Sequence, residues 1–293
     1  DIAIDLSGYT RGGRPQIFAH RAAPIQVSYL GFPGSMGSNF IDYIIVDKNL
    51  VPPENQKYYS EKPIYLPRQY QAQDSSLSLE KPPSKQQLGL PEDAFIFCAI
   101  NNTYKITSAE FDIWMRLLSR VEGSVLWLFA PNELAKENLI KHAGKRGISS
   151  DRLVFAKKLS FIEYVDQLSH ADLYLDTFNY NAGATASNVL WAGVPLITKA
   201  GVGYSARMAS SLLQSIGMPE LITKTPEDYE ALALNLAKNP VKLSAIRLLL
   251  SLKCINSELF DVEAFTGDLE NSYRKIYQRY VEGKKPDVIY VER

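Results

Sequence analysis

Cysteine and histidine are scarce in this sequence, which has two of the former and three of the latter among 293 residues. The two cysteines are too few for a disulfide scaffold, and Cys98 and Cys254 both lie in apolar segments. We therefore expect reduced core thiols and a cytoplasmic protein. The histidines are far apart in the sequence, and none pairs at the spacing of metal ligands, so no metal site is expected.

Charge of one sign is also lacking, because 32 Lys and Arg residues balance 32 Asp and Glu residues without long blocks of either sign. This balance excludes a broad electrostatic attraction to nucleic acid or to an anionic membrane. No apolar run reaches the length of about 18 residues that a membrane-spanning helix needs. Neither nucleic acid nor a membrane is therefore expected as a partner.

Several catalytic motifs are missing too. There is no Gly-x-x-x-x-Gly-Lys-Ser/Thr loop, which excludes a P-loop nucleotidase, and no Gly-x-Ser-x-Gly elbow, which weakens a hydrolase assignment. There is also no Asp-x-Asp pair of the kind that holds a divalent ion beside a diphosphate.

The sequence does contain 46% apolar residues, enough for a real core in one large or two smaller domains. Residues 1–68 hold short strand candidates between turns rich in Gly and Pro. Because Asp1 is not a methionine and the first strand begins at once, we expect a fragment of a larger fold. Residues 69–91 are polar and contain prolines, so we expect a linker there. The strand candidates are Ile2–Leu6, Ile25–Leu30, Tyr43–Val46 and Pro63–Leu66.

From about residue 92 strands and helices alternate, which predicts an α/β fold with a doubly wound parallel sheet. Such a sheet binds ligands beyond the carboxyl ends of its strands. The end of the chain is expected to be entirely helical. The predicted strands are Ala94–Ile100, Val125–Ala130, Leu153–Phe155, Leu173–Asp176 and Leu196–Ile197, and the predicted helices are Ser108–Arg120, Glu133–Arg146, Phe161–Ser169, Ala186–Ala192, Ser205–Ile216, Pro226–Lys238, Val241–Leu252 and Val262–Gly283.

The most informative segment is residues 181–195, where a run of small residues leads from a buried strand into a helix. A helix N-terminus offers free N–H groups and about half a positive charge. Small residues such as Gly183 and Ala184 let an anion approach that backbone closely. The segment therefore predicts a diphosphate site, with an ordinary strand–helix turn as the alternative.

Other loops at the same edge of the sheet carry polar candidates. Lys105 follows the first strand of the second domain, where its ammonium would neutralise a phosphate leaving group; a solvated lysine is the alternative. Asn101 and Asn102 beside it would bond a ligand or cap the loop. Thr185, at the start of the expected helix, would cap that helix or bond a phosphate oxygen.

A third loop follows the strand Leu153–Phe155. The ring of Tyr164 would stack on a flat base, and the backbone near Leu159 would read the base edge; core packing is the alternative for Tyr164. A helix dipole, a lysine and hydroxyls without a metal suit the stabilisation of a nucleoside diphosphate as it leaves a sugar.

A series of motifs along nearly the whole chain closely resembles the O-linked N-acetylglucosamine transferase and SPINDLY family, glycosyltransferase family 41. The resemblance implies the GT-B architecture, with a sugar nucleotide between two Rossmann-like halves, and an inverting, metal-independent transferase. The motifs are Asp5-Leu-Ser-Gly-Tyr-Thr-Arg-Gly, Ala23-Pro-Ile-Gln-Val-Ser-Tyr-Leu-Gly-Phe-Pro-Gly34, Asp42-Tyr-Ile-Ile, Tyr104-Lys-Ile, Gly123-Ser-Val-Leu-Trp-Leu128, Ala171-Asp-Leu-Tyr-Leu-Asp-Thr177 and Val189-Leu-Trp-Ala-Gly-Val-Pro195.

On this resemblance, residues 1–68 are the remnant of an incomplete N-terminal, acceptor-side α/β half, and residues 92–293 are the donor-binding half with C-terminal helices. The family's proposed catalytic histidine and aspartate, and the tetratricopeptide repeats that hold protein substrates, lie upstream of the point where this chain begins. Lys105 is then the catalytic candidate of this chain, and the base is expected elsewhere.

The resemblance also assigns individual positions. Lys105 matches the lysine that contacts the diphosphate, and Asn102 stands where the animal enzymes have glutamine. Thr185 matches one of two adjacent phosphate-binding threonines, and Ala184 replaces the other. Leu159 corresponds to the residue whose backbone meets uracil.

Further matches and departures complete the expected site. Tyr164 replaces a histidine that packs on the base. Leu30 and Gly31 match a turn whose backbone approaches the donor sugar. The departures are Phe161 for a ribose-contacting lysine, Gln167 for a base-contacting arginine, Asn188 for a ribose-bonding aspartate and Gly183 for a histidine.

We therefore expect a transferase that moves N-acetylglucosamine from UDP-GlcNAc to a protein Ser or Thr hydroxyl, with no cofactor. The expected partners are the nucleotide sugar, the protein acceptor and an upstream tetratricopeptide region. Three alternatives remain: a GDP-fucose or UDP-glucose donor, as in other members; a non-catalytic nucleotide-sugar-binding module; and a GT-B epimerase.

Overall fold

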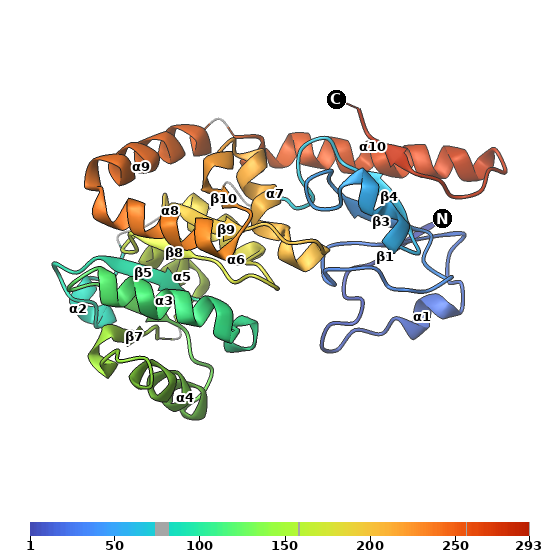
Figure 1. The fold of residues 1–293 in the computed structure, drawn as a ribbon. Coiled ribbons are helices and arrows are strands. Elements are labelled where there is room, and N and C mark those ends of the chain that lie inside the picture. Colours follow the sequence, from blue (N-terminus) through green and yellow to red (C-terminus); the bar gives the residue numbers. More distant parts are fainter. Residues whose placement is uncertain (74–81, 158, 256, 293) are drawn as a thin grey trace. The chain divides into compact units, whose positions relative to one another are not determined.

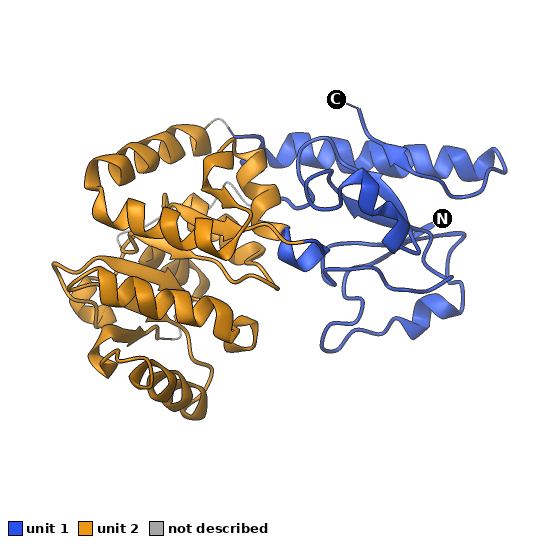
Figure 2. Ribbon diagram, in the orientation of Figure 1, with its two compact units in different colours: residues 1–75, 202–207, 257–293 blue, residues 76–201, 208–256 orange. Residues whose placement is uncertain are grey.

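The computed structural model describes residues 1–73, 82–157, 159–255 and 257–292. The chain divides into two compact units, coloured separately in Figure 2. Unit 1 holds residues 1–75, 202–207 and 257–293, and unit 2 holds residues 76–201 and 208–256. Each unit is built on its own parallel sheet.

Unit 1 has a five-stranded parallel sheet in the order β1-β2-β3-β4-β11. Apolar side chains of its central strands, such as Val27, Ile45 and Ile64, are fully buried. They form one core with Phe265 and Ile276 of the long helix α10, which runs beside the sheet in Figure 1. The elements are β1 (Ile2–Asp5), α1 (Gln16–Ala19), β2 (Ile25–Ser28), β3 (Tyr43–Val46), β4 (Lys62–Tyr65), α10 (Val262–Val281) and β11 (Ile289–Tyr290).

The C-terminal part of the chain differs from the prediction. An all-helical end is wrong, because Ile289 and Tyr290 form β11 and pair in parallel with Ile64 and Tyr65 of β4. The ring of Tyr290 also stacks on that of Tyr65, with the ring centroids 5.1 Å apart. The assignment of residues 92–293 to one donor-binding half is corrected accordingly, since residues 257–293 belong to unit 1.

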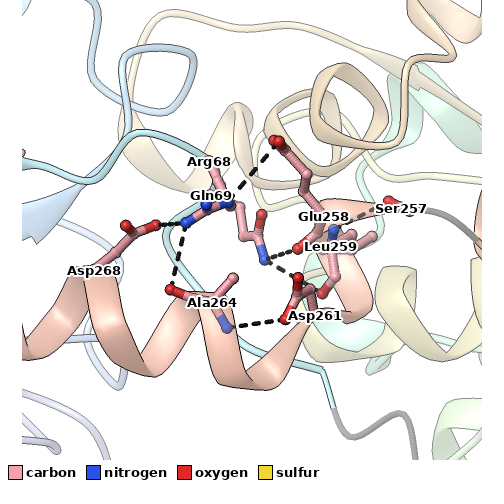
Figure 3. Close-up of polar contacts among 8 residues, drawn as sticks. All are labelled: Arg68, Gln69, Ser257, Glu258, Leu259, Asp261, Ala264 and Asp268. Atoms are coloured by element: carbon pink, nitrogen blue, oxygen red, sulfur yellow. Dashed lines mark hydrogen bonds and ion pairs between the residues drawn. The ribbon is translucent and has the colours of Figure 1, made fainter. Parts of the chain in front are cut away.

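Polar contacts tie the start of α10 to the segment that follows β4 (Figure 3). The Arg68 guanidinium forms an ion pair with Asp268 and donates a hydrogen bond to the carbonyl of Ala264 at 3.3 Å. The Gln69 side-chain amide donates to the carbonyl of Glu258 at 2.9 Å. These contacts, together with the shared apolar core, explain why the last helix belongs to unit 1 although unit 2 precedes it in the sequence.

The predicted linker 69–91 is also corrected. Gln69 and Tyr70 are fully buried, and the Tyr70 amide donates to the Asp47 carboxylate at 3.0 Å. Helix α2 (Lys85–Leu88) begins with a capping box formed by Ser84 and Gln87. The first residues of the predicted linker therefore belong to unit 1 and its last residues to unit 2. Residues 74–81 lie outside the described residues.

Unit 2 has a six-stranded parallel sheet in the order β10-β9-β8-β5-β6-β7. From β5 the chain continues outward to β6 and β7, then returns to the other side of β5 with β8. The topological switch point, where such sheets bind ligands, therefore lies between β5 and β8. The strands are β5 (Ile96–Ala99), β6 (Val125–Leu128), β7 (Leu153–Phe155), β8 (Leu173–Leu175), β9 (Leu196–Lys199) and β10 (Ile222–Thr223).

Helices alternate with these strands, as the periodicity predicts (Figure 1). In α3 the apolar face that includes Phe111, Trp114 and Leu118 is buried, and the helix begins with a capping box formed by Thr107 and Glu110. Each such side chain contributes about 1.5–3 kcal/mol by leaving water. The helices of unit 2 after α2 are α3 (Ser108–Arg120), α4 (Glu133–Gly144), α5 (Phe161–Leu168), α6 (Ala184–Trp191), α7 (Met208–Ser215), α8 (Pro226–Lys238) and α9 (Pro240–Ile255).

Smaller differences concern element ends. Helix α6 begins at Ala184, two residues before the predicted start, and the segment predicted as one helix over Ser205–Ile216 is a 3₁₀ turn followed by α7. Strand β10 was not predicted, because two residues are too few for a periodic signal. The 3₁₀ turns are η1 (Pro53–Tyr58), η2 (Thr103–Lys105), η3 (Ser150–Arg152), η4 (Tyr204–Ala206), η5 (Pro219–Leu221) and η6 (Glu258–Phe260).

Both cysteines are free, as predicted, and burial raises the pKa of the Cys98 and Cys254 thiols to about 12. No helix within the described part of the chain is both long and apolar enough to cross a membrane.

Candidate functional site

A cavity of about 290 Å³ opens at the carboxyl ends of β5, β6 and β7 in unit 2. It lies at the edge of the sheet where the switch point predicts ligand binding. Its walls come from the loops after these strands, from α5 and from the start of α6. The lining residues are Ile100, Asn101, Asn102, Tyr104, Lys105, Phe129, Ala156, Lys157, Leu159, Tyr164, Gln167 and Thr185.

Lys105 is the half-buried cation of this cavity and ends the turn η2. Its ammonium donates a hydrogen bond to the carbonyl of Asn181 at 3.0 Å and lies 4.1 Å from the centroid of the Tyr180 ring. Burial lowers the pKa of Lys105, and the Asp176 carboxylate opposes that shift. Because neither a carbonyl nor a ring carries net charge, these two contacts leave the ammonium's charge available to an anion.

The loop after β8 and the start of α6 face this lysine. Gly183 precedes the first residue of α6, and no side chain among the described residues caps the helix there. Thr185 lies in the first turn and lines the cavity, where its hydroxyl is hydrogen-bonded to Tyr164. The first-turn N–H groups of α6 therefore lack the side-chain acceptor that helix starts usually have, which is the condition for binding an anion.

Two buried amide side chains line the cavity, Asn101 at 4% and Gln167 at 1% exposure. Among the described residues, Asn101 Nδ2 and Gln167 Oε1 have no hydrogen-bond partner. An unpaired buried polar atom costs about 1–3 kcal/mol, and both residues line the cavity, so each amide would gain a hydrogen bond by turning this atom toward a ligand there. Asn101 Nδ2 is a hydrogen-bond donor and Gln167 Oε1 is an acceptor, so the pair suits a ligand edge that carries both an acceptor and a donor.

Tyr164 lines the same wall. Burial raises the pKa of its phenol to about 12, although the hydrogen bond with Thr185 acts in the opposite direction. The phenol therefore stays neutral at physiological pH, and the ring is a flat apolar surface beside the two amides. This wall combines stacking with hydrogen bonding, as a nucleobase site requires.

The structure brings seven of the predicted candidate residues to this cavity. It does not place Gly183, Ala184 or Asn188 in the lining, and Asn188 is buried within α6. The predicted residues that line it are Asn101, Asn102, Lys105, Leu159, Tyr164, Gln167 and Thr185.

The remaining predicted residues, Leu30 and Gly31, belong to unit 1. Leu30 has a positive φ of 67°. A Cβ on Gly31 would lie 2.0 Å from the carbonyl oxygen of Leu6, so only glycine fits this turn. Their role toward a donor sugar stays a prediction.

Asp176 and Tyr180 are parts of the site that the sequence did not indicate, whereas Asn181 begins the segment predicted to hold a diphosphate. The available signal was Asp176 itself, an acidic residue that directly follows the buried strand β8 at the ligand-binding edge. In the described ranges, no three or more His, Cys, Asp or Glu side chains gather in a way that would hold a metal ion.

The two parallel sheets with alternating helices are the architecture of the GT-B fold. Sucrose-phosphate synthase from Thermosynechococcus elongatus shares this fold, with a TM-score of 0.62 and 17% identity over 90% of this chain and 71% of that chain. At the level of sequence, the chain belongs to glycosyl transferase family 41, whose family model matches residues 1–81 and 81–269.

Two proteins of similar sequence support this family assignment. A probable UDP-N-acetylglucosamine–peptide N-acetylglucosaminyltransferase SEC of Arabidopsis thaliana is 36% identical over 97% of this chain and 30% of its own length. The corresponding SPINDLY protein of Eustoma exaltatum subsp. russellianum is 31% identical over 100% of this chain and 32% of its own length. This chain thus spans less than a third of these relatives, at 30% and 32%.

A solved structure supports the same assignment. A mutant of the O-GlcNAc transferase from Thermobaculum terrenum superimposes with a TM-score of 0.86 and 28% identity, over 94% of this chain and 53% of that chain. The predicted family, fold class and enzyme class are therefore confirmed.

Proposed function

We propose that this chain is the donor-binding, carboxyl-terminal part of a transferase that moves N-acetylglucosamine from UDP-GlcNAc to a Ser or Thr hydroxyl of a protein. The observation that carries the proposal is the Lys105 ammonium, held between the carbonyl of Asn181 and the ring of Tyr180 at the switch point. The names of the relatives, UDP-N-acetylglucosamine–peptide N-acetylglucosaminyltransferases, support this donor and a protein acceptor.

In this proposal the reaction is inverting and needs no metal. The Lys105 ammonium and the first-turn N–H groups of α6 stabilise the negative charge that develops on the nucleoside diphosphate as its bond to the sugar breaks. The acceptor hydroxyl attacks from the opposite face of the sugar, where positioning supplies much of the rate. The scarcity of cysteine supports a cytoplasmic setting for this chemistry.

The base of the donor would occupy the wall formed by Leu159, Tyr164 and Gln167. The Tyr164 ring would stack on the base. Asn101 Nδ2 and Gln167 Oε1, which have no hydrogen-bond partner within the described part of the chain, would turn to bond the edge of the base.

Titration calorimetry of the chain with UDP-GlcNAc, UDP-glucose and GDP-fucose tests the proposal. We expect UDP-GlcNAc to bind most tightly, and Lys105→Ala to weaken its binding about tenfold to a hundredfold, since a charge-assisted hydrogen bond is lost. The matched control is Lys136→Ala, because Lys136 is an exposed lysine of α4 that pairs with Glu133. Equal affinity of wild type and Lys105→Ala would refute the assigned role of Lys105.

A non-catalytic nucleotide-sugar sensor is the second candidate. It is favoured by the absence of Gly183, Ala184 and Asn188 from the cavity lining, which leaves fewer contacts to the donor. Transfer of labelled sugar to a protein acceptor, abolished by Lys105→Ala, would be seen only for an enzyme. Release of an altered sugar without any acceptor would instead indicate an epimerase.

A further inference from the structure

A fully buried carboxylate, Asp176, organises the loop that follows β8. One carboxylate oxygen accepts hydrogen bonds from the amides of Thr177 at 2.9 Å and Ala182 at 2.7 Å. The other oxygen accepts from the Thr198 hydroxyl of β9 at 2.7 Å. Thr177 and Ala182 lie near the two ends of this loop. The shared carboxylate oxygen therefore holds the two ends of the loop close together.

The loop is also fastened from inside. The Thr177 hydroxyl donates to the carbonyl of Tyr180 at 2.6 Å, and the Asn181 side-chain amide donates to the carbonyl of Thr177 at 2.6 Å. These bonds hold the Tyr180 carbonyl and the Asn181 side chain. The Tyr180 ring and the Asn181 carbonyl, which contact the Lys105 ammonium, belong to the same two residues.

We propose that Asp176 is a positioning residue of the donor site, an inference that rests on the function proposed above. It acts through residues 177–182 and sets the place of the Lys105 ammonium relative to the first turn of α6. Asp176 need not touch the donor, since its carboxylate already bonds the loop and Thr198.

The cost of this arrangement supports a functional role. Burial raises the pKa of Asp176 to about 7, although its hydrogen bonds and the charge of Lys105 act to lower that pKa. Among the described residues, the buried phenols of Tyr174 and Tyr229 also interact with this carboxylate. A neutral side chain would satisfy packing without this electrostatic cost, so the carboxylate is explained by the loop that it shapes.

A double-mutant cycle tests the proposal, with UDP-GlcNAc affinity measured by calorimetry. We expect Asp176→Ala to weaken binding about tenfold in the wild-type chain but less than about threefold in the Lys105→Ala background, because coupled residues are not additive. The matched control is Asp172→Ala. Asp172 also bonds a main-chain amide, that of Ile96, but lies before β8 rather than after it.

The conservative variant Asp176→Asn keeps an oxygen for the two loop amides, so we expect it to retain affinity within about threefold of wild type. A loss as large as that of Asp176→Ala would overturn positioning through these hydrogen bonds. If Asp176→Ala does not fold, Thr177→Val replaces it in the double-mutant cycle, since this variant removes the hydrogen bond to the Tyr180 carbonyl. Unchanged UDP-GlcNAc binding by Thr177→Val would then overturn the proposal.

The outcomes separate the two proposals. If the wild-type chain binds no nucleoside diphosphate sugar, the proposed function fails and the role of Asp176 with it. If wild type binds the sugar nucleotide but Asp176→Ala weakens binding equally in both backgrounds, only the positioning role is overturned.

Discussion

The Lys105 ammonium and the Asn181 carbonyl meet at 3.0 Å although 76 positions separate them in the sequence. The contact joins the loop after β5 to the loop after β8, the two neighbouring strands at the switch point of the sheet. A cation and a helix start are thereby brought to one cavity. The sequence predicts this convergence because strand order in a doubly wound sheet dictates which loops become neighbours.

The first prediction concerns the buried amide Gln167. Replacing it with methionine keeps most of its volume and removes the unpaired Oε1. We expect Gln167→Met to raise the free energy of unfolding by about 1 kcal/mol while lowering the affinity for UDP-GlcNAc, because the atom is costly only until a ligand pairs with it. Urea denaturation and calorimetry measure the two effects. The exposed Gln214→Met on α7 is the control, and a stability loss in Gln167→Met would contradict the prediction.

Much of the fold follows from apolar periodicity. The predicted elements Tyr43–Val46, Ser108–Arg120 and Pro226–Lys238 agree with the structure at both ends. Strand β11 could not be found in this way, because two residues carry no period and its place is set by β4, more than 200 positions earlier. Long-range pairing of this kind depends on the assembled sheet, not on local preference.

The site divides in the same manner. Lys105 and Thr185 are visible in the sequence because each follows a strand at the ligand-binding edge. The free atoms of Asn101 and Gln167 are not visible, since burial and the lack of a partner among the described residues exist only in the folded chain. Asp176 was missed for a related reason: its partner Thr198 belongs to another strand.

The second prediction concerns stacking by Tyr164. We expect Tyr164→Ala to weaken UDP-GlcNAc binding by about 1–3 kcal/mol, the usual worth of an aromatic ring stacked on a base. Tyr164→Phe keeps the ring and loses only the hydrogen bond with Thr185, so its effect is expected to be below about 1 kcal/mol. Calorimetry of both variants checks this. Equal losses in the two variants would assign the role to the hydroxyl instead.

The third prediction is a pH dependence of stability. The pKa of Asp176 is raised by burial from 3.8 to about 7, so the folded state holds its proton more tightly than the unfolded state does. The stability contributed by this proton is complete below the unfolded pKa and is lost as pH rises toward the folded pKa. We expect the free energy of unfolding of Asp176→Asn, relative to wild type, to increase by about 3 kcal/mol between about pH 5 and about pH 8.

Urea denaturation of both chains at the two pH values measures this change. Asp176→Asn is the reference for the wild type, because asparagine does not titrate and the two chains share every other titratable group. A difference that stays constant with pH would show that the folded-state pKa of Asp176 is not raised.

The last prediction concerns the attachment of α10 to unit 1. Arg68→Leu leaves the Asp268 carboxylate, whose side chain is only 10% exposed, without its cation. We expect a loss of about 3–5 kcal/mol, because a buried charge without its partner is strongly destabilising. The matched control Arg274→Leu breaks an exposed pair with Glu270 on the same helix and is expected to cost under about 1 kcal/mol.

Amide hydrogen exchange along α10 measures the effect directly. Tryptophan fluorescence would not report on it, since the tryptophans Trp114, Trp127 and Trp191 all lie in unit 2. Exchange that is equally slow in wild type and Arg68→Leu would show that the apolar core with Phe265 and Ile276 is sufficient to hold the helix.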